Sequence, residues 1–418
     1  MSESDSLLKP PPVPPLLRLA SIDAYRGFVM FLMMAEILHL RQVADKVAEA
    51  GESCTKILSG RSTDIWDFLA KQQSHVEWVG CTLHDMIQPS FSFLVGVALS
   101  FSLVSRLAKG QSKCWMTVHA FWRALVLILL GVFLRSMSSS QTNWTFEDTL
   151  TQIGLGYGFL FMLGLTGSVR VQLGALLVIL VGYWCAFAFY PLPGDDFDWA
   201  KAGVAADWKH HLEGFAAHWN KNTNPAWTFD VWFMNIFPRD QAFSNNGGGY
   251  VTLSFIPTLA TMILGLLAGN LLRSNAKWWR KFGLFVVFGA ICLGLGWGLD
   301  SLGVCPIVKR IWTPSWVLFS GGICFLILAA FYLFVDLVRL KFLVFPWIVI
   351  GTNSIVTYCF VSKMMSPFFA HHLKIHLGGN FFKYYGTAYE PLFLGLVVLL
   401  INWLFLLWLY RRKIFVKI

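Results

Sequence analysis

The chain has 418 residues, of which 56% are hydrophobic and 13% are charged, and its formal net charge at pH 7 is +10. A soluble domain carries about 25% charged residues, so this composition excludes an ordinary soluble protein. The sequence predicts an all-α polytopic protein embedded in a lipid bilayer, in which the excess of Lys and Arg reports topology and does not indicate nucleic acid as a partner.

Apolar runs of about 20 residues mark helices that cross a membrane. We expect about ten such helices packed in one bundle, at roughly residues 20–40, 83–105, 116–136, 149–168, 171–190, 252–272, 281–302, 315–336, 342–364 and 391–411. They occupy residues 18–418, which we therefore expect to form one transmembrane domain. The Pro-rich residues 1–17 are expected to be a disordered cytoplasmic lead.

Short connections rich in Lys and Arg stay on the cytoplasmic side of a membrane. With ten spans, most of the basic residues between helices fall on one side, which places both termini in the cytoplasm. The long connections, at about residues 41–82 and 191–251, then become extracytoplasmic loop caps, and residues 365–390 lie on the same side. Arg135, Lys309 and Arg310 fall on this outer side and break the pattern.

The first predicted helix carries charged residues that are costly in a membrane. Asp23 and Arg26 are three residues apart, so they share one face of the helix, and Glu36 follows further along. The Asp23 and Arg26 pair either ties helices together or binds a charged group that enters from the cytoplasm. Arg123 lies inside the third predicted helix, where an ionisable group is a functional candidate by default.

The entrance to the second predicted helix carries the stretch His75-Val-Glu-Trp78-Val-Gly80-Cys-Thr-Leu-His-Asp85. Imidazole titrates near neutrality, which suits it to take up or deliver a proton. The carboxylate of Asp85 would orient the His75 ring if the chain turns back at Gly80. Alternatively, His75 is an interfacial histidine that caps the helix. His84 is expected to point to a different helix face and is left out of the predicted site.

The connection over residues 191–251 is rich in Trp and also holds His210, His211 and His218. Such a surface suits stacking against sugar rings, and it equally suits an interfacial aromatic belt. The histidines lack the spacing of a zinc site, and the eight cysteines form no CxxC pair, so no metal site is predicted. Cys54, Cys81 and Cys305 fall on the outer side, where a disulfide could form.

Several motifs of the chain resemble one family of membrane enzymes. The pattern His75-x-x-Trp78-x-Gly80, followed by Asp85, resembles the heparan-alpha-glucosaminide N-acetyltransferase family and its bacterial relatives of unknown substrate. The likeness spans residues 18 to about 360 and is carried by further elements: Arg18-Leu-Ala-Ser21-Ile-Asp23-Ala-Tyr25-Arg26-Gly27, Gln152-Ile153-Gly154-Leu-Gly156-Tyr157, Ile256-Pro257, Pro306-Ile-Val-Lys309-Arg-Ile-Trp312 and Gly351-Thr-Asn353-Ser354.

The resemblance implies an acyltransferase that moves an acetyl group from cytoplasmic acetyl-CoA to an amino sugar or glycan beyond the membrane. It implies His75 as the catalytic residue, helped by Asp85, and leaves open whether His75 is a base or carries an acetyl-imidazole intermediate. Asp23, Arg26 and Arg123 become candidates for binding acetyl-CoA. The bacterial relatives imply the inner (cytoplasmic) membrane of a bacterium.

The candidates for binding the acceptor are Trp78, Glu36, Asn353 and Ser354. The chain departs from the family at residues 308–310, which read Val-Lys-Arg in place of a motif containing Asn, and this departure bears on the acceptor sugar. The expected partners are the bilayer, acyl-CoA and a saccharide, with a homodimer left open. The alternative is a multi-pass transporter or flippase, although the two halves of the chain show no convincing internal repeat.

Overall fold

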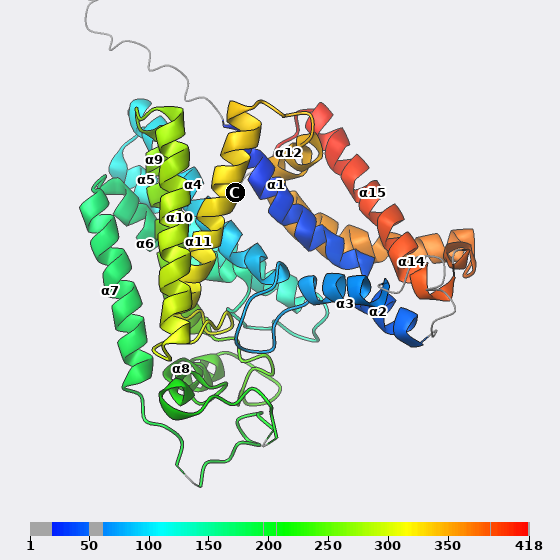
Figure 1. Cartoon of the computed structure of the whole chain (residues 1–418), viewed down its shortest axis with the longest axis horizontal. Coiled ribbons are helices and arrows are strands. Elements are labelled where there is room, and N and C mark those ends of the chain that lie inside the picture. Colours follow the sequence, from blue (N-terminus) through cyan, green and yellow to red (C-terminus); the bar gives the residue numbers. More distant parts are fainter. Residues whose placement is uncertain (1–18, 50–61, 195, 206, 385, 417–418) are drawn as a thin grey trace, which may run out of the picture.

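The computed structural model describes residues 19–49, 62–194, 196–205, 207–384 and 386–416. The predicted lead over residues 1–17 and Cys54 lie outside these ranges. The described chain is all-helical, with one isolated β-bridge, and Figure 1 shows its bundle of long helices. Its α-helices are α1 (Ala20–Met34), α2 (Leu40–Glu49), α3 (Ser62–Gln72), α4 (Ile87–Ala108), α5 (Lys113–Ser136), α6 (Thr149–Leu165), α7 (Val169–Ala188), α8 (Pro225–Phe233), α9 (Phe255–Arg273), α10 (Trp278–Ser301), α11 (Pro314–Phe331), α12 (Phe345–Thr352), α13 (Ser354–Val356), α14 (Ser366–Leu377) and α15 (Glu390–Arg411). The 3-10 and π-helical segments used below are η2 (Ala35–Leu38), η4 (His84–Met86), η5 (Gly214–Trp219) and η9 (Thr357–Met365).

The protein is a polytopic membrane protein. Eight helices in the described part of the chain are long and apolar enough to cross a bilayer, and they coincide with eight of the ten predicted spans. The predicted span 149–168 is α6, which has 17 residues and is shorter than a typical span.

The predicted span 342–364 corresponds to a bent pair of helices. The helix is broken after α12, and the helical stretch Ser354–Leu377 continues at an angle of 79°. Asn353 causes the break because its backbone (φ −124°, ψ 43°) leaves the helical region and interrupts the ladder of hydrogen bonds. Counting this bent pair as one span gives up to nine candidate spans among the described residues.

The predicted loop cap over residues 41–82 contains two helices, α2 and α3. In α2 the apolar residues recur at helical spacing, and Val43 and Val47 are buried against Ala388, with Trp66 of α3 packed beside them. These helices pack near the start of α15, as Figure 1 shows at the lower right. A polar segment with an amphipathic pattern therefore lies on the end of the bundle as helices.

The other long connection, residues 191–251, is mostly irregular, apart from η5, α8 and short 3-10 turns. An aromatic core shared with other parts of the chain holds it in place: Trp219 of this segment and Trp78 are fully buried there, and the Trp78 indole N–H donates to the Trp219 carbonyl oxygen at 3.0 Å. We call this segment the cap, and the end of the bundle that it covers the cap end.

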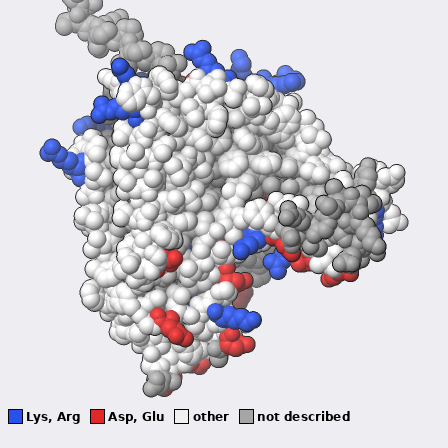
Figure 2. Space-filling model, in the orientation of Figure 1, with Lys and Arg blue, Asp and Glu red and all other residues white. Residues whose placement is uncertain are grey.

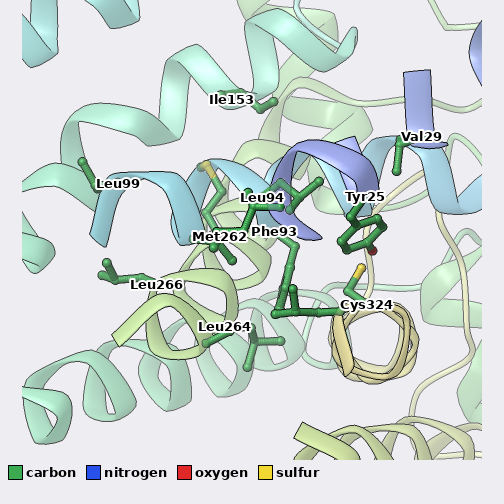
Figure 3. Packing of buried hydrophobic residues seen from close by; sticks show 14 of the residues in the cluster. Tyr25, Val29, Phe93, Leu94, Leu99, Ile153, Met262, Leu264, Leu266 and Cys324 are labelled. Carbon is green, nitrogen blue, oxygen red and sulfur yellow. The ribbon is translucent and has the colours of Figure 1, made fainter. Parts of the chain in front are cut away.

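The centre of the bundle is an apolar core contributed by α1, α4, α9 and α11. Figure 3 shows Phe93 and Leu94 of α4 facing Met262 of α9, with Tyr25 of α1 close to Cys324 of α11. Within this core, α4 and α9 pack closely. An added Cβ at Gly96 would overlap the backbone of α9, and one at Gly265 would overlap the backbone of α4. Small residues at such crossings let membrane helices approach each other.

We therefore expect Gly96→Ala to destabilise the protein by about 1–3 kcal/mol, the usual cost of overpacking. The new methyl group would meet the Met262 carbonyl oxygen, which is backbone and can yield only if the two helices separate. Thermal unfolding of the purified protein in detergent measures the effect. Gly174→Ala on α7 is the matched control, since its Cβ would meet open space. Equal melting temperatures for the two variants would contradict the close packing.

Charge is distributed unevenly between the two ends of the bundle. Figure 2 shows Lys and Arg along the end opposite the cap, and mixed acidic and basic residues toward the cap. Hydrogen bonds tie several connections together at the basic end: Arg273 donates to the Ser100 carbonyl oxygen at 2.9 Å, and Asn270 donates to Gln172 at 3.1 Å. The ends of α4 and α9 and the start of α7 therefore meet at one end of the bundle.

Candidate active site

The site is built on two chain segments that enter α4 and α11 at the cap end. Val79 and Val308 form an isolated antiparallel bridge, and the amide of Gly80 donates to the Ile307 carbonyl oxygen at 3.0 Å. Gly80 has φ +118°, a conformation that a residue with a Cβ rarely adopts. The chain thus turns back at Gly80, the condition on which the expected pairing of Asp85 with His75 depends, and brings the segment before α4 against the segment before α11.

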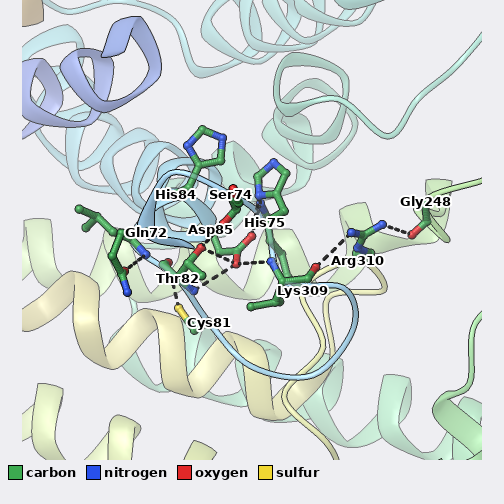
Figure 4. A network of polar contacts seen from close by, with 12 residues as sticks. Gln72, Ser74, His75, Cys81, Thr82, His84, Asp85, Gly248, Lys309 and Arg310 are labelled. Carbon is green, nitrogen blue, oxygen red and sulfur yellow. Dashed lines mark hydrogen bonds and ion pairs between the residues drawn. The ribbon is translucent and has the colours of Figure 1, made fainter. Parts of the chain in front are cut away.

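Three ionisable side chains meet where these segments join. The Nδ1 atom of His75 lies 2.7 Å from Oδ1 of Asp85, and Nζ of Lys309 lies 3.1 Å from the same oxygen. Lys309 Nζ is also 3.2 Å from His75 Nδ1. Figure 4 shows the His75 ring above Asp85, with Lys309 reaching in from the other segment. Asp85 is therefore shared between an imidazole and an ammonium group.

The second oxygen of Asp85 is held by the chain itself. Oδ2 accepts hydrogen bonds from the amides of Val76 and Thr82, at 3.2 and 3.1 Å, and lies 2.9 Å from the Thr82 hydroxyl. These donors favour the ionised carboxylate. Since an ionised carboxylate can only accept a hydrogen bond, its 2.7 Å contact with Nδ1 assigns the proton of this bond to His75. The lone pair of His75 is then on Nε2.

The cation of this group is almost completely buried. The Lys309 side chain is 5% exposed, and burial lowers the pKa of Lys309, while the neighbouring carboxylate of Asp85 acts in the opposite direction. A buried cation is tolerated when it is paired and hydrogen-bonded. The adjacent Arg310 donates to the carbonyl oxygens of Val76 and Gly248 and so ties the site to the cap.

His75 opens onto a cavity of about 340 Å³ at the cap end of the bundle. The side chain of His75 is 39% exposed, so its ring is accessible from this cavity. Side chains of both charges form the lining, which consists of Met33, Met34, Glu36, Ile37, His39, His75, His84, Ile87, Gln88, Arg135, Glu147, Asp148, Thr149, Tyr250, Lys309, Tyr358, Ser362, Lys363, Ser366 and Pro367. The cavity therefore has the polarity needed to hold a hydrophilic molecule beside the imidazole.

The cavity wall near the end of α5 and the start of α6 carries acidic side chains, whose charge is partly neutralised by an arginine. Arg135 lies 3.8 Å from Glu147, and Asp148 caps the start of α6 by accepting from the amides of Leu150 and Thr151. Burial raises the pKa of both Glu147 and Asp148. Arg135, which broke the expected topology pattern, is thus a cavity residue with an acidic partner.

The expectation that His84 points away from His75 is wrong. Its ring lies 4.5 Å from the ring of His75, centroid to centroid, and its Nε2 is 3.5 Å from Oε1 of Glu36. The prediction assumed that α4 begins before His84. In fact η4 is a 3-10 turn, which changes the direction of the side chains, and Figure 4 shows the two imidazoles beside each other.

The four residues predicted to bind the acceptor do not lie together in the structure. Glu36 lines the cavity. Trp78 is fully buried in the cap, and Asn353 is fully buried at the helix break, where it donates to the Ile414 carbonyl oxygen and accepts from the Val416 amide. Ser354 donates to the Gly351 carbonyl oxygen. These last three residues are not part of the cavity lining.

The residues predicted to bind acetyl-CoA also lie away from this cavity. Asp23 and Arg26 share a face of α1 as predicted, with a 3.8 Å ion pair. Arg123 donates to the Tyr157 hydroxyl at 3.2 Å and lies over the Tyr157 ring. None of the three lines the cavity that contains His75.

Two of the three cysteines expected on the outer side lie in the described part of the chain. In the described residues Cys81 and Cys305 are free thiols, and burial raises their pKa to about 12 and about 11, respectively. Across the same part of the chain, no group of three or more His, Cys, Asp or Glu side chains is arranged to hold a metal ion.

Two curated proteins resemble the chain. It is 23% identical to human (Homo sapiens) heparan-alpha-glucosaminide N-acetyltransferase over 97% of its own length, and 23% identical to the mouse (Mus musculus) protein of the same name over 68%. The chain spans 60% of the human protein and 48% of the mouse protein. No family model matches it. The comparisons confirm a distant homology to this N-acetyltransferase family.

Proposed function

We propose that this distant homologue of heparan-alpha-glucosaminide N-acetyltransferase is a transmembrane acetyltransferase that uses acetyl-CoA and acetylates an amino sugar or glycan. The observation that carries the proposal is the contact of His75, at the edge of a polar cavity, with the buried Asp85 and Lys309. An imidazole whose Nδ1 proton is held by a carboxylate presents its Nε2 lone pair for a proton or for an acyl carbon. The homology supplies the reaction class.

In the mechanism that we propose, His75 Nε2 takes a proton from the attacking amine while the nitrogen lone pair forms a bond to the thioester carbonyl carbon. The carbon–sulfur bond then breaks, and the proton passes to the leaving thiolate. Asp85 positions the ring and stabilises the imidazolium that forms during the reaction. Lys309 balances the charge of Asp85, so that the carboxylate remains ionised within a buried site.

An assay of purified protein with labelled acetyl-CoA and a panel of amino sugars tests the proposed function. We expect label to appear in at least one acceptor, with free CoA formed in equal amount. A protein that releases neither CoA nor an acetylated product with any acceptor would refute the proposal. If it instead moves sugars across vesicles without acetylating them, the transporter interpretation is correct.

The orientation of the protein is also a proposal. The end opposite the cap carries the basic connections, which favours the cytoplasmic side, so the cavity with His75 would face outward. A donor made in the cytoplasm would then have to reach His75 through the protein, because its phosphates cannot cross hydrocarbon unaided.

Sealed vesicles of known orientation test this arrangement. With acetyl-CoA on the basic side and the acceptor on the cap side, we expect acetylated acceptor to accumulate on the cap side. With both substrates confined to the basic side, we expect only a background signal. Transfer that requires acetyl-CoA on the cap side would contradict the arrangement, although the proposed reaction could still be correct.

A further inference from the structure

The cavity contains a second pair of an imidazole and a carboxylate, next to the first. Glu36 reaches in from η2, and its Oε1 lies 3.5 Å from His84 Nε2. The His84 side chain is 10% exposed and that of Glu36 is 54% exposed, so the histidine lies deeper and the acid lies toward the open cavity. The rings of His84 and His75 are 4.5 Å apart. Two imidazoles, each with its own carboxylate, therefore face one space.

Transfer of an acetyl group to a protonated amine requires that the amine nitrogen lose two protons, one after the other. An amino sugar enters as an ammonium ion, which has no lone pair for attack. It must lose one proton to become a nucleophile and a second one when the new nitrogen–carbon bond forms. The second proton ends on the thiolate of CoA, and the first must leave to solvent. His75 can account for only one of these two transfers at a time.

We propose that His84, positioned by Glu36, removes the first proton from the acceptor ammonium. In this step the N–H bond of the ammonium breaks, its electron pair stays on nitrogen, and the proton moves to the imidazole of His84 and on to solvent through the cavity. The free amine then attacks the thioester with His75 as base. This inference rests on the proposed function. It identifies the acceptor as an amine that is protonated when it binds.

Charged groups of both signs surround His84. Glu36 faces it from η2, His75 from the segment before α4 and Lys309 from the segment before α11, while Asp85 is its neighbour in η4. Lys363 of η9 lines the cavity too. Glu36 is the carboxylate nearest to the open cavity among these groups, so it can also attract the ammonium ion before the proton is removed.

The pH dependence of two variants tests the inference. We expect His84→Gln to lower kcat/KM for glucosamine by roughly 10²-fold at a pH well below the amine pKa. The defect should shrink toward none as the pH rises above that pKa, because the amine then binds already deprotonated. Glu36→Gln should show the same dependence to a smaller extent, and Glu36→Asp should restore part of the activity. His371→Gln, an exposed position on α14, is the matched control.

A second acceptor separates this role from a structural one. An alkoxyamine is uncharged at neutral pH and needs no first deprotonation, so we expect His84→Gln to acetylate it at nearly the wild-type rate. An equal loss of activity with both acceptors at every pH, or no loss at all, would overturn the inference while the proposed function stands. A wild-type protein that acetylates neither acceptor would instead refute the proposed function.

Discussion

Replacing His75 by Ala should lower acetyl transfer by a factor of roughly 10²–10⁴, the usual loss when a general acid–base group is removed. His75 Nδ1 is fixed at 2.7 Å from Asp85, and the ring is exposed to the cavity. Acetyl transfer by purified variants, measured at saturating acetyl-CoA, tests the expectation.

Folding must be assessed separately from catalysis in this experiment. The His75 ring is partly exposed, so its loss leaves a gap that water can fill, and we expect a melting temperature close to that of the wild type. His210→Ala, an exposed histidine of the cap, is the matched control and should keep full activity. A folded His75→Ala protein with normal transfer rates would exclude His75 from the chemistry.

The pairing of His75 with Asp85 could be predicted from the sequence because it is local. The two residues are ten positions apart, and Gly80 lies between them where the chain must reverse. A glycine beside a helix entrance is a signal that needs no distant part of the chain. The same signal could not place His84, since its direction depends on whether the helix starts as a 3-10 turn or as an α-helix.

The participation of Lys309 could not be predicted in the same way. It lies 224 positions from Asp85 in the chain, and only the packing of two loops brings the side chains together. In the sequence it was counted as an exception to the topology pattern, as was Arg135. Basic residues on the predicted outer side of a membrane protein are uncommon, and both Lys309 and Arg135 have an acidic partner in the structure.

The positions of the membrane helices could be predicted from hydropathy, because each helix must form all its backbone hydrogen bonds internally within the bilayer. The helix break at Asn353 and the burial of Trp78 could not be predicted from the sequence. Asn353 leaves the helix to bond the C-terminal segment, and Trp78 bonds Trp219 across 141 positions, so both depend on tertiary contacts. Apolar periodicity reports that a segment is helical, and it does not report where a polar side chain finds its partner.

Replacing Lys309 by Met should be the most damaging substitution for stability. Met fills a similar volume but leaves the buried carboxylate of Asp85 without its cation, and breaking a buried ion pair from one side costs about 3–5 kcal/mol. Asp85 is fully buried and lies 3.1 Å from Lys309 Nζ, so water cannot easily replace the lost charge. Thermal unfolding in detergent measures the loss. Lys363→Met, an exposed cation of the same cavity, should change stability by no more than about 0.5 kcal/mol.

The double variant Lys309→Met with Asp85→Asn shows whether the loss comes from the unpaired charge. Removing both charges leaves no buried ion, so we expect the double variant to be more stable than Lys309→Met alone. It should remain inactive, because an amide in place of Asp85 no longer stabilises the imidazolium of His75. If the two substitutions were simply additive in stability, Lys309 and Asp85 would not be coupled. Lys309 would then serve only to fill space between the two loops, and the charge balance that we assign to the site would be wrong.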